Sequence, residues 1–530
     1  MNSKIWWREY RRRKRVSDAR DFSTESILRK TFKATVKDYI DNCSLSGLKQ
    51  VCEPNTCITQ RIIRIFFFCV MLAGVFYFLQ YLWYGNISKP LIIVMDSSTY
   101  PISSIDFPAV TICNFNRISK MALENYVQKF QQRSNRRKDA KGIREQLLQL
   151  GRLIDYSYNK TLLNGKFQSF EENLENYDGV VEIMKELSPP CDKMLIKCSW
   201  LGVIQDCNKL FKVHLTVRGH CCSFNHISEH QDTNRSEIGK FQAERQRVPG
   251  IQYGLNVILD AMIEDYSYSL YNMKGFEIFI FESSHFGDPT GGRVIQKITQ
   301  PDYLSFFEIY SVKQTATPEV RKYKIGTRKC YFQDELKKQF KGLYSYSQCI
   351  MNCRIKAVQS LCKCTPYYYK DSKNQDMPVC TIQHLRCLNK HMEKFIYLYP
   401  KNAESNEGLD EEIQNALRCL HCLPDCEVTR HFTKQSRIEL TRLDKNKKFL
   451  NFYLKGINMS NKGLVTIYQG KGTGVLTRLD IVSYWYEIVS NIGGFCSILV
   501  GLSTIGVLEI LYFFVFRFYI NLYRFYVNRK

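Results

Sequence analysis

A short strip of small residues interrupts an apolar stretch near the end of the chain. The stretch GGFCSILVGLSTIGVLEILYFF begins at Gly493 and contains Gly501-Leu502-Ser503 in its middle. Glycine inside a helix costs about 1 kcal/mol relative to alanine, so these residues need a compensating role. A glycine carbonyl and a serine hydroxyl offer oxygens that can replace the hydration shell of a cation. The strip therefore predicts the constriction of an ion path at Gly501, Leu502 and Ser503, although small residues also suit simple helix dimerisation.

A carboxylate follows the strip in the same segment. Glu509 comes about two helical turns after the strip. We expect it to face the same path from the inner side, because ionisable groups inside a membrane usually face a bundle interior or water.

Two segments are long and apolar enough to cross a membrane, for which about 20 residues suffice. The first runs from Ile62 to Trp83 with one charge, Arg64, and the second from about Ile488 to Phe516. Basic residues precede the first segment and follow the second. The positive-inside rule then places both termini in the cytoplasm.

This topology predicts five regions along the chain. They are a cytoplasmic segment 1–60, a first transmembrane helix 61–84, an extracellular domain 85–482, a second transmembrane helix 483–516 and a cytoplasmic tail 517–530.

The region between the spans has the composition of an extracellular domain. Most of the 21 cysteines lie between positions 113 and 426, and such density favours disulfides in an oxidising compartment. The same region contains four Asn-x-Ser/Thr sequons, which are candidate glycosylation sites: Asn86, Asn159, Asn234 and Asn458.

Strand and helix patterns alternate irregularly in this domain, which predicts an α+β fold. Strand propensity is high at Val110–Ile112 and in FKVHLTVRG from Phe211 and GFEIFIFESS from Gly275. GIREQLLQLGRLIDYSYN, from Gly142, places leucines on an approximate helical face.

The cysteines from Cys330 to Cys426 suggest a ladder of disulfides. Cys349 and Cys353 are four residues apart on a predicted helix, and Cys419 and Cys422 could face them. Nested pairing would give Cys353–Cys419, Cys349–Cys422 and Cys330–Cys426, leaving Cys362, Cys364, Cys380 and Cys387 for two more bridges. Spacing alone does not fix connectivity. Cys419-x-x-Cys422 also resembles half of a zinc site, which we disfavour because the set is dense and extracellular.

Several function classes are disfavoured by composition and motifs. The net charge of +24 suits nucleic acid or an anionic membrane, but the basic residues are spread out, so no nucleic-acid partner is predicted. The histidines form no His/Asp/Ser arrangement that would suggest catalysis, so we predict no catalytic residues, no cofactor and no metal. A non-conducting two-pass receptor or modulatory subunit remains the alternative to a channel.

Several segments together resemble the degenerin/epithelial sodium channel family. They are FPAVTICN at Phe107–Asn114, the Gly501-Leu502-Ser503 strip followed by Glu509, and the cysteine array from Cys330. The strip resembles the family's Gly/Ser-x-Ser selectivity filter. The resemblance covers about residues 41–516. Four further segments resemble the arthropod pickpocket branch: RKCYF at Arg328, YSYSQC at Tyr344, SNIGG at Ser490 and CCSFN at Cys221.

The resemblance implies a trimeric, sodium-preferring cation channel that amiloride blocks. Each chain would assemble in the plasma membrane with two further subunits of the same or a related kind. The extracellular domain would comprise palm, β-ball, finger, knuckle and thumb, with the finger at about 117–210 and the thumb at about 330–426.

Individual roles follow from the same resemblance. Ser490 falls at the degenerin position, where a bulky side chain typically holds family channels open. The family's thumb pattern matches the three nested pairs and implies Cys362–Cys387 and Cys364–Cys380. It pairs Cys113 with Cys221 or Cys222 and leaves Cys191, Cys198 and Cys207 unassigned.

One departure precedes the first span. The family usually has His-Gly in a short re-entrant segment that lines the inner pore and affects gating. The matching residues here are Ser46-Gly47, which lack the imidazole. We therefore expect gating to differ from the family norm, and the subunit to need partners.

Overall fold

The structure is a computed structural model of the chain. It describes residues 28–45, 51–52, 57–87, 90–133, 140–158, 179–227, 243–336, 344–369, 377–399, 407–408, 410–440 and 453–527. The chain divides into two compact units, one of residues up to Ile92 and from Ile481, the other of residues Ile93–Asp480. We name these the helical unit and the central domain.

The first long helix of the helical unit is α3 (Ile58–Leu82). It ends in a π-helical turn, Trp83–Ile87. No residue from Ile65 to Tyr84 carries a charge, and a helix satisfies the backbone of such a segment internally. By length and composition, Ile58–Gly85 and Thr504–Arg524 both suffice to cross a membrane.

The second apolar segment is a succession of helices. It consists of α18 (Trp485–Val500), α19 (Thr504–Leu511), a π-helical stretch (Tyr512–Arg517) and α20 (Phe518–Val527). The structure thus differs from the single helix expected over 483–516, because the helix is interrupted at Gly501–Ser503. It also continues past Arg517 into the region expected to be a tail.

A helix at residues 28–42 packs on the end of this second segment. The Tyr39 ring lies 5.7 Å from that of Phe513 and 5.6 Å from that of Phe514, centroid to centroid. The Asn521 side-chain amide donates to the Thr35 hydroxyl at 3.1 Å. These contacts fix the chain that leads toward the first span.

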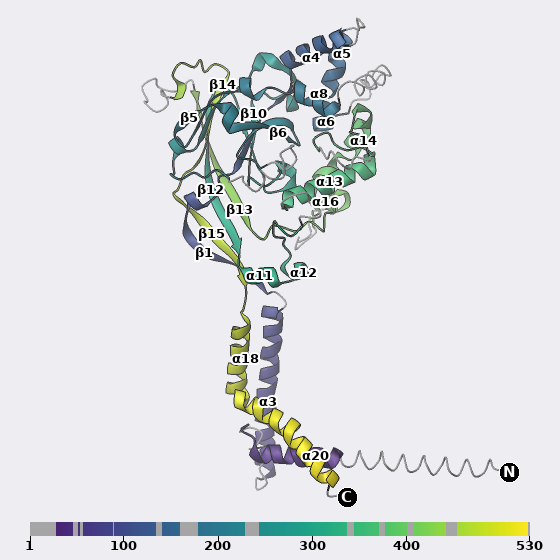
Figure 1. The fold of residues 1–530 in the computed structure, drawn as a ribbon, viewed down its shortest axis with the longest axis vertical. Coiled ribbons are helices and arrows are strands. Elements are labelled where there is room, and N and C mark those ends of the chain that lie inside the picture. The colour runs from purple at the N-terminus through teal and green to yellow at the C-terminus, as the bar shows by residue number, and fades with distance from the viewer. Residues whose placement is uncertain are drawn as a thin grey trace, which may run out of the picture. The chain divides into compact units, whose positions relative to one another are not determined.

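Two large β-sheets and a two-stranded sheet form the central domain (Figure 1). The eight-stranded sheet has the order β1-β15-β12-β14-β8-β4-β5, with β13 pairing β12, and the five-stranded sheet has the order β11-β10-β2-β7-β6. β3 pairs with β9. The strands are β1 Leu91–Pro101, β2 Ala109–Asn114, β3 Asn116–Ser119, β4 Leu195–Trp200, β5 Val203–Gln205, β6 Phe211–Thr216, β7 Gly219–Phe224, β8 Leu255–Asp260, β9 Tyr266–Ser269, β10 Phe276–Phe281, β11 Ile295–Thr299, β12 Tyr303–Ala316, β13 Val428–Glu439, β14 Lys462–Gln469 and β15 Thr473–Ile481.

The main core lies between the two large sheets. Successive side chains of a strand point to opposite faces. In β10, Phe276, Ile278 and Ile280 join a core with residues of β8, β12 and β14. Phe279 and Phe281 pack on the other face of β10. Both faces are buried, which explains why the sequence FEIFIF is apolar at five of its six positions.

Helices build a second core beside the five-stranded sheet. Buried side chains of this core come from α4 (Lys120–Arg133), α5 (Ala140–Gln149), α6 (Arg152–Asp155), α8 (Val180–Leu187) and α13 (Tyr346–Cys362). The leucine-rich pattern from Gly142 thus forms the expected helix, with Ile143 and Leu147 buried in α5. The mixture of sheets and helices agrees with the predicted α+β domain.

Eight disulfides fasten the central domain. Five of them join the pairs expected in the array from Cys330: Cys330–Cys426, Cys349–Cys422, Cys353–Cys419, Cys362–Cys387 and Cys364–Cys380. The other three are Cys113–Cys221, Cys191–Cys222 and Cys198–Cys207. The five remaining cysteines, all in the helical unit, are free.

The ladder also decides against the zinc alternative. α13 places Cys349 and Cys353 one turn apart, and each bonds one cysteine of the Cys419-x-x-Cys422 pair. Cys349, His421 and Cys422 lie close enough to hold a metal, but the two sulfurs are bonded to each other. A cysteine binds zinc only as a thiolate, and the sulfurs of Cys349 and Cys422 are in a disulfide.

The cysteine doublet is resolved by strand alternation. Cys221 and Cys222 are consecutive in β7 and point to opposite faces of the sheet. Cys221 packs with Phe279 on one face and bonds Cys113, whereas Cys222 joins the inter-sheet core and bonds Cys191.

We predict that Cys353→Ser/Cys419→Ser lowers the stability of the purified full-length protein. Loss of a bridge that closes a long loop should cost about 2–4 kcal/mol, seen as a lower Tm under non-reducing conditions. Cys496→Ser, which removes a free thiol, is the control and should leave Tm unchanged. An equal Tm for the double variant and the wild type would show that this rung does not stabilise the fold.

Candidate functional site

The interruption of the second apolar segment is built by Gly501. Its φ of 73° and ψ of 19° are left-handed, a conformation that glycine adopts at little cost and other residues rarely adopt. The Gly501 amide donates to the Ser497 carbonyl at 3.0 Å and the Leu502 amide to the Cys496 carbonyl at 3.2 Å. The helix α18 therefore ends here, within an apolar segment.

Ser503 starts the next helix. Its backbone is extended, with φ −93° and ψ 168°, and its hydroxyl oxygen accepts a hydrogen bond from the Gly506 amide at 3.2 Å. Serine is a preferred N-cap for this reason. Gly501 and Ser503 thus each have a local structural role, and between them the backbone leaves the helical hydrogen-bond ladder.

Small and polar residues form one face of α18. Ser490, Gly494, Ser497 and Gly501 follow a spacing of three or four, so they lie along one side of the helix. All four are exposed in the single chain, and a Cβ on Gly494 would meet no atom within 4 Å. We name this row the small face.

The opposite side of α18 packs against α3 (Figure 1). The rings of Phe78 and Phe495 stack with centroids 3.5 Å apart. A Cβ on Gly74 of α3 would lie 3.5 Å from Leu499 Cδ1. Phe495 and Leu499 are more than a quarter turn from the small face at about 100° per residue. The contact with α3 therefore leaves the small face uncovered.

The segment before the first span contacts the second segment just after the interruption. The Ser44 amide donates to a Glu509 carboxylate oxygen at 2.9 Å, although Glu509 was expected to face an open path. Cys43 and Leu45 are buried in a cluster with Leu502 and Ile510. Gly506 makes this approach feasible, since its Cβ would lie 3.3 Å from Ser44 Oγ.

These contacts were missed by sequence reasoning. The one local signal is Thr31, Thr35 and Tyr39, which are spaced by four and buried on one face of the 28–42 helix. Ser44 and Glu509 are 465 residues apart, and nothing in either local sequence indicates the pairing.

Some predicted positions have no described geometry. Ser46 and Gly47, and the sequons at Asn159 and Asn234, lie outside the described residues. Asn86 is in the π-helical turn after α3. Asn458 is exposed, and its side-chain oxygen accepts from the Ser460 amide at 3.1 Å. An exposed side chain is accessible for glycosylation, which remains a prediction.

Residues 39–513 match the family described as amiloride-sensitive sodium channel. The match covers the first apolar segment, the central domain, the interruption and the second apolar segment as far as residue 513. The chain belongs to the amiloride-sensitive sodium channel family. The family resemblance inferred from FPAVTICN, the Gly-Leu-Ser strip and the cysteine array is thereby confirmed.

The relatives of this amiloride-sensitive sodium channel family member include proteins of flies. The chain is 26% identical over 504 residues to the sodium channel protein Nach of Drosophila ananassae, covering 92% of this chain and 88% of the relative. It is 25% identical over 556 aligned positions to pickpocket protein 28 of Drosophila melanogaster, covering 96% of this chain and 82% of the relative. The expected likeness to the pickpocket branch is confirmed.

We predict that Gly506→Leu displaces the Ser44 segment and exposes Cys43, which is only 5% exposed in the structure. A leucine side chain cannot fit where even a Cβ lies 3.3 Å from Ser44 Oγ. Maleimide labelling of Cys43 should rise severalfold in a background where the other four free cysteines are serine.

Gly493→Leu is the matched control, because a Cβ there meets no atom within 4 Å. It should leave Cys43 labelling unchanged. Equal labelling in Gly506→Leu and in the background protein would contradict the close packing of the two segments.

Proposed function

We propose that this chain is one subunit of a trimeric, sodium-preferring, amiloride-sensitive cation channel of the plasma membrane. The observation that carries the proposal is the non-helical backbone at Gly501–Ser503 in the middle of an apolar segment. In a membrane, irregular backbone is tolerated where it is buried in protein or lines water, but not against lipid. The uncovered small face continues from this interruption along α18.

In the proposed assembly, three copies of the small face surround one axis. Small residues let the helices approach closely. The carbonyls of Gly501 and Leu502 and the hydroxyl of Ser503 would then supply oxygens to a partly dehydrated Na⁺. Ser490, at the outer end of the small face, would gate the path, and a bulky side chain there would hold the helices apart.

The proposed orientation has both termini in the cytoplasm and the central domain outside the cell. It is supported by the basic residues that flank the apolar segments. The distribution of cysteines also supports this orientation, because all the disulfide-bonded cysteines lie in the central domain and all the free cysteines lie in the helical unit. An oxidising exterior produces this distribution.

The inner part of the proposed pore involves Glu509 and the segment before α3. Glu509 accepts from Ser44, so its charge is linked to the chain that leads into Ser46-Gly47. We propose that this segment moves with the second span during gating. The two partner subunits in the proposed trimer would be the same chain or related chains.

The alternative is a modulatory subunit that does not conduct by itself. Ser46 is the residue that favours it, since the family's imidazole is absent at the inner pore. In a conducting subunit, this chain's own residues set the ion selectivity of the current. In a modulatory subunit, they do not.

We predict that Ser490→Phe produces a constitutive, amiloride-blocked sodium current in cells expressing this chain, alone or with related subunits. Val489→Phe, the same change on a neighbouring exposed position off the small face, should not. Adding Ser503→Ala should reduce the sodium-to-potassium permeability ratio about tenfold, because one lost oxygen ligand to a cation costs on the order of 1.5 kcal/mol.

The controls separate the two candidates. Surface biotinylation shows whether each variant reaches the membrane. No current in any combination with related subunits, despite surface expression, would reject the channel proposal in favour of a non-conducting receptor. If Ser503→Ala leaves the sodium-to-potassium permeability ratio of the current unchanged, this chain is a modulatory subunit.

A further inference from the structure

A small cavity in the central domain is lined by basic side chains and by no acidic side chain among the described residues. It lies between β3, the β6–β7 turn, α6, α8 and α9 (Cys191–Met194), and the bonded cysteines Cys221 and Cys222 form part of its wall. Its volume is about 10 Å³, roughly the space of one water-sized particle. Among the described residues that line it are two arginines and a histidine, and none is a carboxylate.

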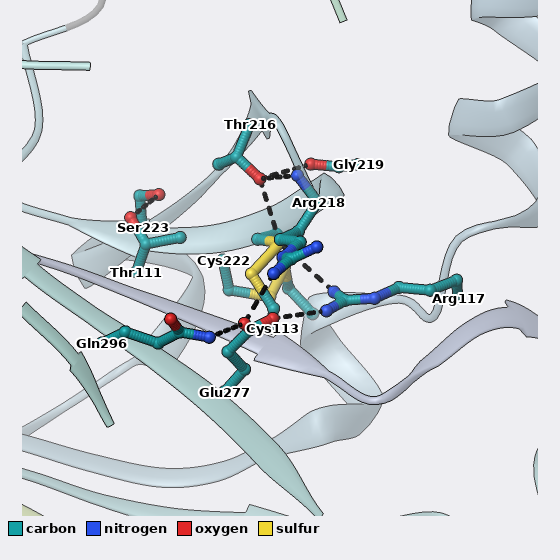
Figure 2. Close-up of a disulfide and its surroundings, with 12 residues drawn as sticks. Thr111, Cys113, Arg117, Thr216, Arg218, Gly219, Cys222, Ser223, Glu277 and Gln296 are labelled. Carbon is teal, nitrogen blue, oxygen red and sulfur yellow. Dashed lines mark hydrogen bonds and ion pairs between the residues drawn. A yellow bond between two sulfur atoms is a disulfide. The ribbon is translucent and has the colours of Figure 1, made fainter. Parts of the chain in front are cut away.

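The two arginines share a single buried acid (Figure 2). Glu277 of β10 is fully buried, and one of its oxygens accepts from Arg117 Nη2 at 2.7 Å. The other oxygen lies 3.4 Å from Arg218 Nε and also accepts from the Gln296 side-chain amide. One carboxylate thus serves two guanidinium groups and an amide, so one positive charge in this cluster has no counter-charge.

The geometry of the cluster is fixed by the fold. Strand alternation in β10 puts Glu277 on the face away from the inter-sheet core. Arg218 lies in the turn between β6 and β7, where the Thr216 hydroxyl accepts from the Arg218 amide and donates to the Gly219 carbonyl. The Cys113–Cys221 bridge ties this turn's strand to β2. These contacts fix the backbone at Arg218, whose side chain is 18% exposed, whereas the side chain of Arg117 is 3% exposed.

Polar atoms around the cavity lack partners within the described chain. Arg117 has a side chain only 3% exposed, yet its Nε makes no hydrogen bond to any described residue. The same holds for His220 Nδ1 and for the hydroxyl of Tyr367, which lies 3.3 Å from where a Gly219 Cβ would be. A buried donor left unpaired costs about 1–3 kcal/mol, and more when it is charged.

The local field is positive and the surroundings are apolar. Burial lowers the pKa of His220 to about 4, and the nearby Lys185 charge acts in the same direction. Burial lowers the pKa of Arg117, and Arg218 lowers it further against the opposing effect of Glu277. Ile154, Met184 and Met194 line the cavity and keep the dielectric low, which strengthens any charge interaction there.

We propose that this cavity binds one small monovalent anion, chloride in the extracellular medium, held by Arg117 and Arg218. A water molecule would fill the same space but would leave the surplus charge uncompensated, whereas an anion neutralises it and accepts from the orphan donors. The bound ion would join β3 and the β6–β7 turn to the helical layer at α8. This site is independent of the proposed pore and of any current.

The test is the thermal stability of the purified full-length protein in sodium chloride and in sodium methanesulfonate, at equal ionic strength and pH 7. In the wild type, Tm should rise saturably with chloride by about 2 °C or more, because a ligand that binds only the folded state stabilises it. Bromide should act like chloride, and iodide less, since the cavity is small. A Tm that does not depend on chloride, or that changes linearly without saturation, would overturn the proposal.

Substitutions at the cavity test whether the chloride-dependent shift in Tm arises there. Arg218→Gln leaves the Arg117–Glu277 pair intact and should abolish the chloride-dependent shift. Arg321→Gln, which removes an exposed arginine paired with Asp334, should keep it. If Arg218→Gln does not fold, Met184→Phe, which fills the cavity without changing charge, should abolish the shift instead. A saturable shift that persists in Arg218→Gln or in Met184→Phe would place the anion elsewhere and refute the site.

Discussion

A backbone that leaves the helical ladder inside an apolar segment is the constraint on which the helical unit depends. Peptide groups in a hydrocarbon environment must be paired within the protein or meet water. Gly501 turns the chain out of α18 in a left-handed conformation, and Ser503 caps α19 with its own hydroxyl. Each residue satisfies one helix end, yet together they leave a stretch of backbone that needs a polar environment. That polar environment would lie on the side of the small face, which no other described element covers.

The rest of the helical unit is arranged around this interruption. α3 covers one side of α18 through Phe78 and Phe495, and the segment before α3 covers the inner side of α19 through Ser44 and Glu509. Gly506 permits that second contact because it has no side chain. The second segment therefore has three different sides. One side of α18 packs against α3, α19 is hydrogen-bonded to the amino-terminal chain, and the small face of α18 is uncovered.

The central domain meets a different requirement. Packing of the two sheets face to face buries one side of β10, and Phe279 and Phe281 are buried in a separate cluster on its other side. Disulfides fix the peripheral helices and turns on that frame. The bridge at Cys113–Cys221 lies beside a buried cluster in which Arg117 and Arg218 face one acid, Glu277. Burying such a cluster costs free energy unless its charges balance. An anion in the adjoining cavity would supply the missing negative charge.

Much of this architecture was predictable from sequence. The apolar lengths predicted the two long apolar segments. The four-residue spacing of Cys349 and Cys353 suggested a nested ladder without fixing its connectivity, and the Gly-Leu-Ser strip indicated the position of the candidate site. The doublet Cys221–Cys222 was not assignable, because moving a strand by one residue exchanges its faces. The helix interruption was not foreseen either, since composition reports apolar length but not backbone conformation. The Ser44–Glu509 contact depends on tertiary packing over the whole chain.

The most direct measurement is the accessibility of the small face to water. Cysteine would be placed at Ser497, on the small face, or at Ile498, which is also highly exposed in the single chain but lies on another side of α18. Both variants would carry Cys496→Ser, and a charged methanethiosulfonate reagent would be applied during current recording. The account predicts that the reagent modifies position 497 and changes the current, and leaves position 498 unmodified. Modification of position 498 with no reaction at 497 would place the small face against lipid or protein and contradict the account.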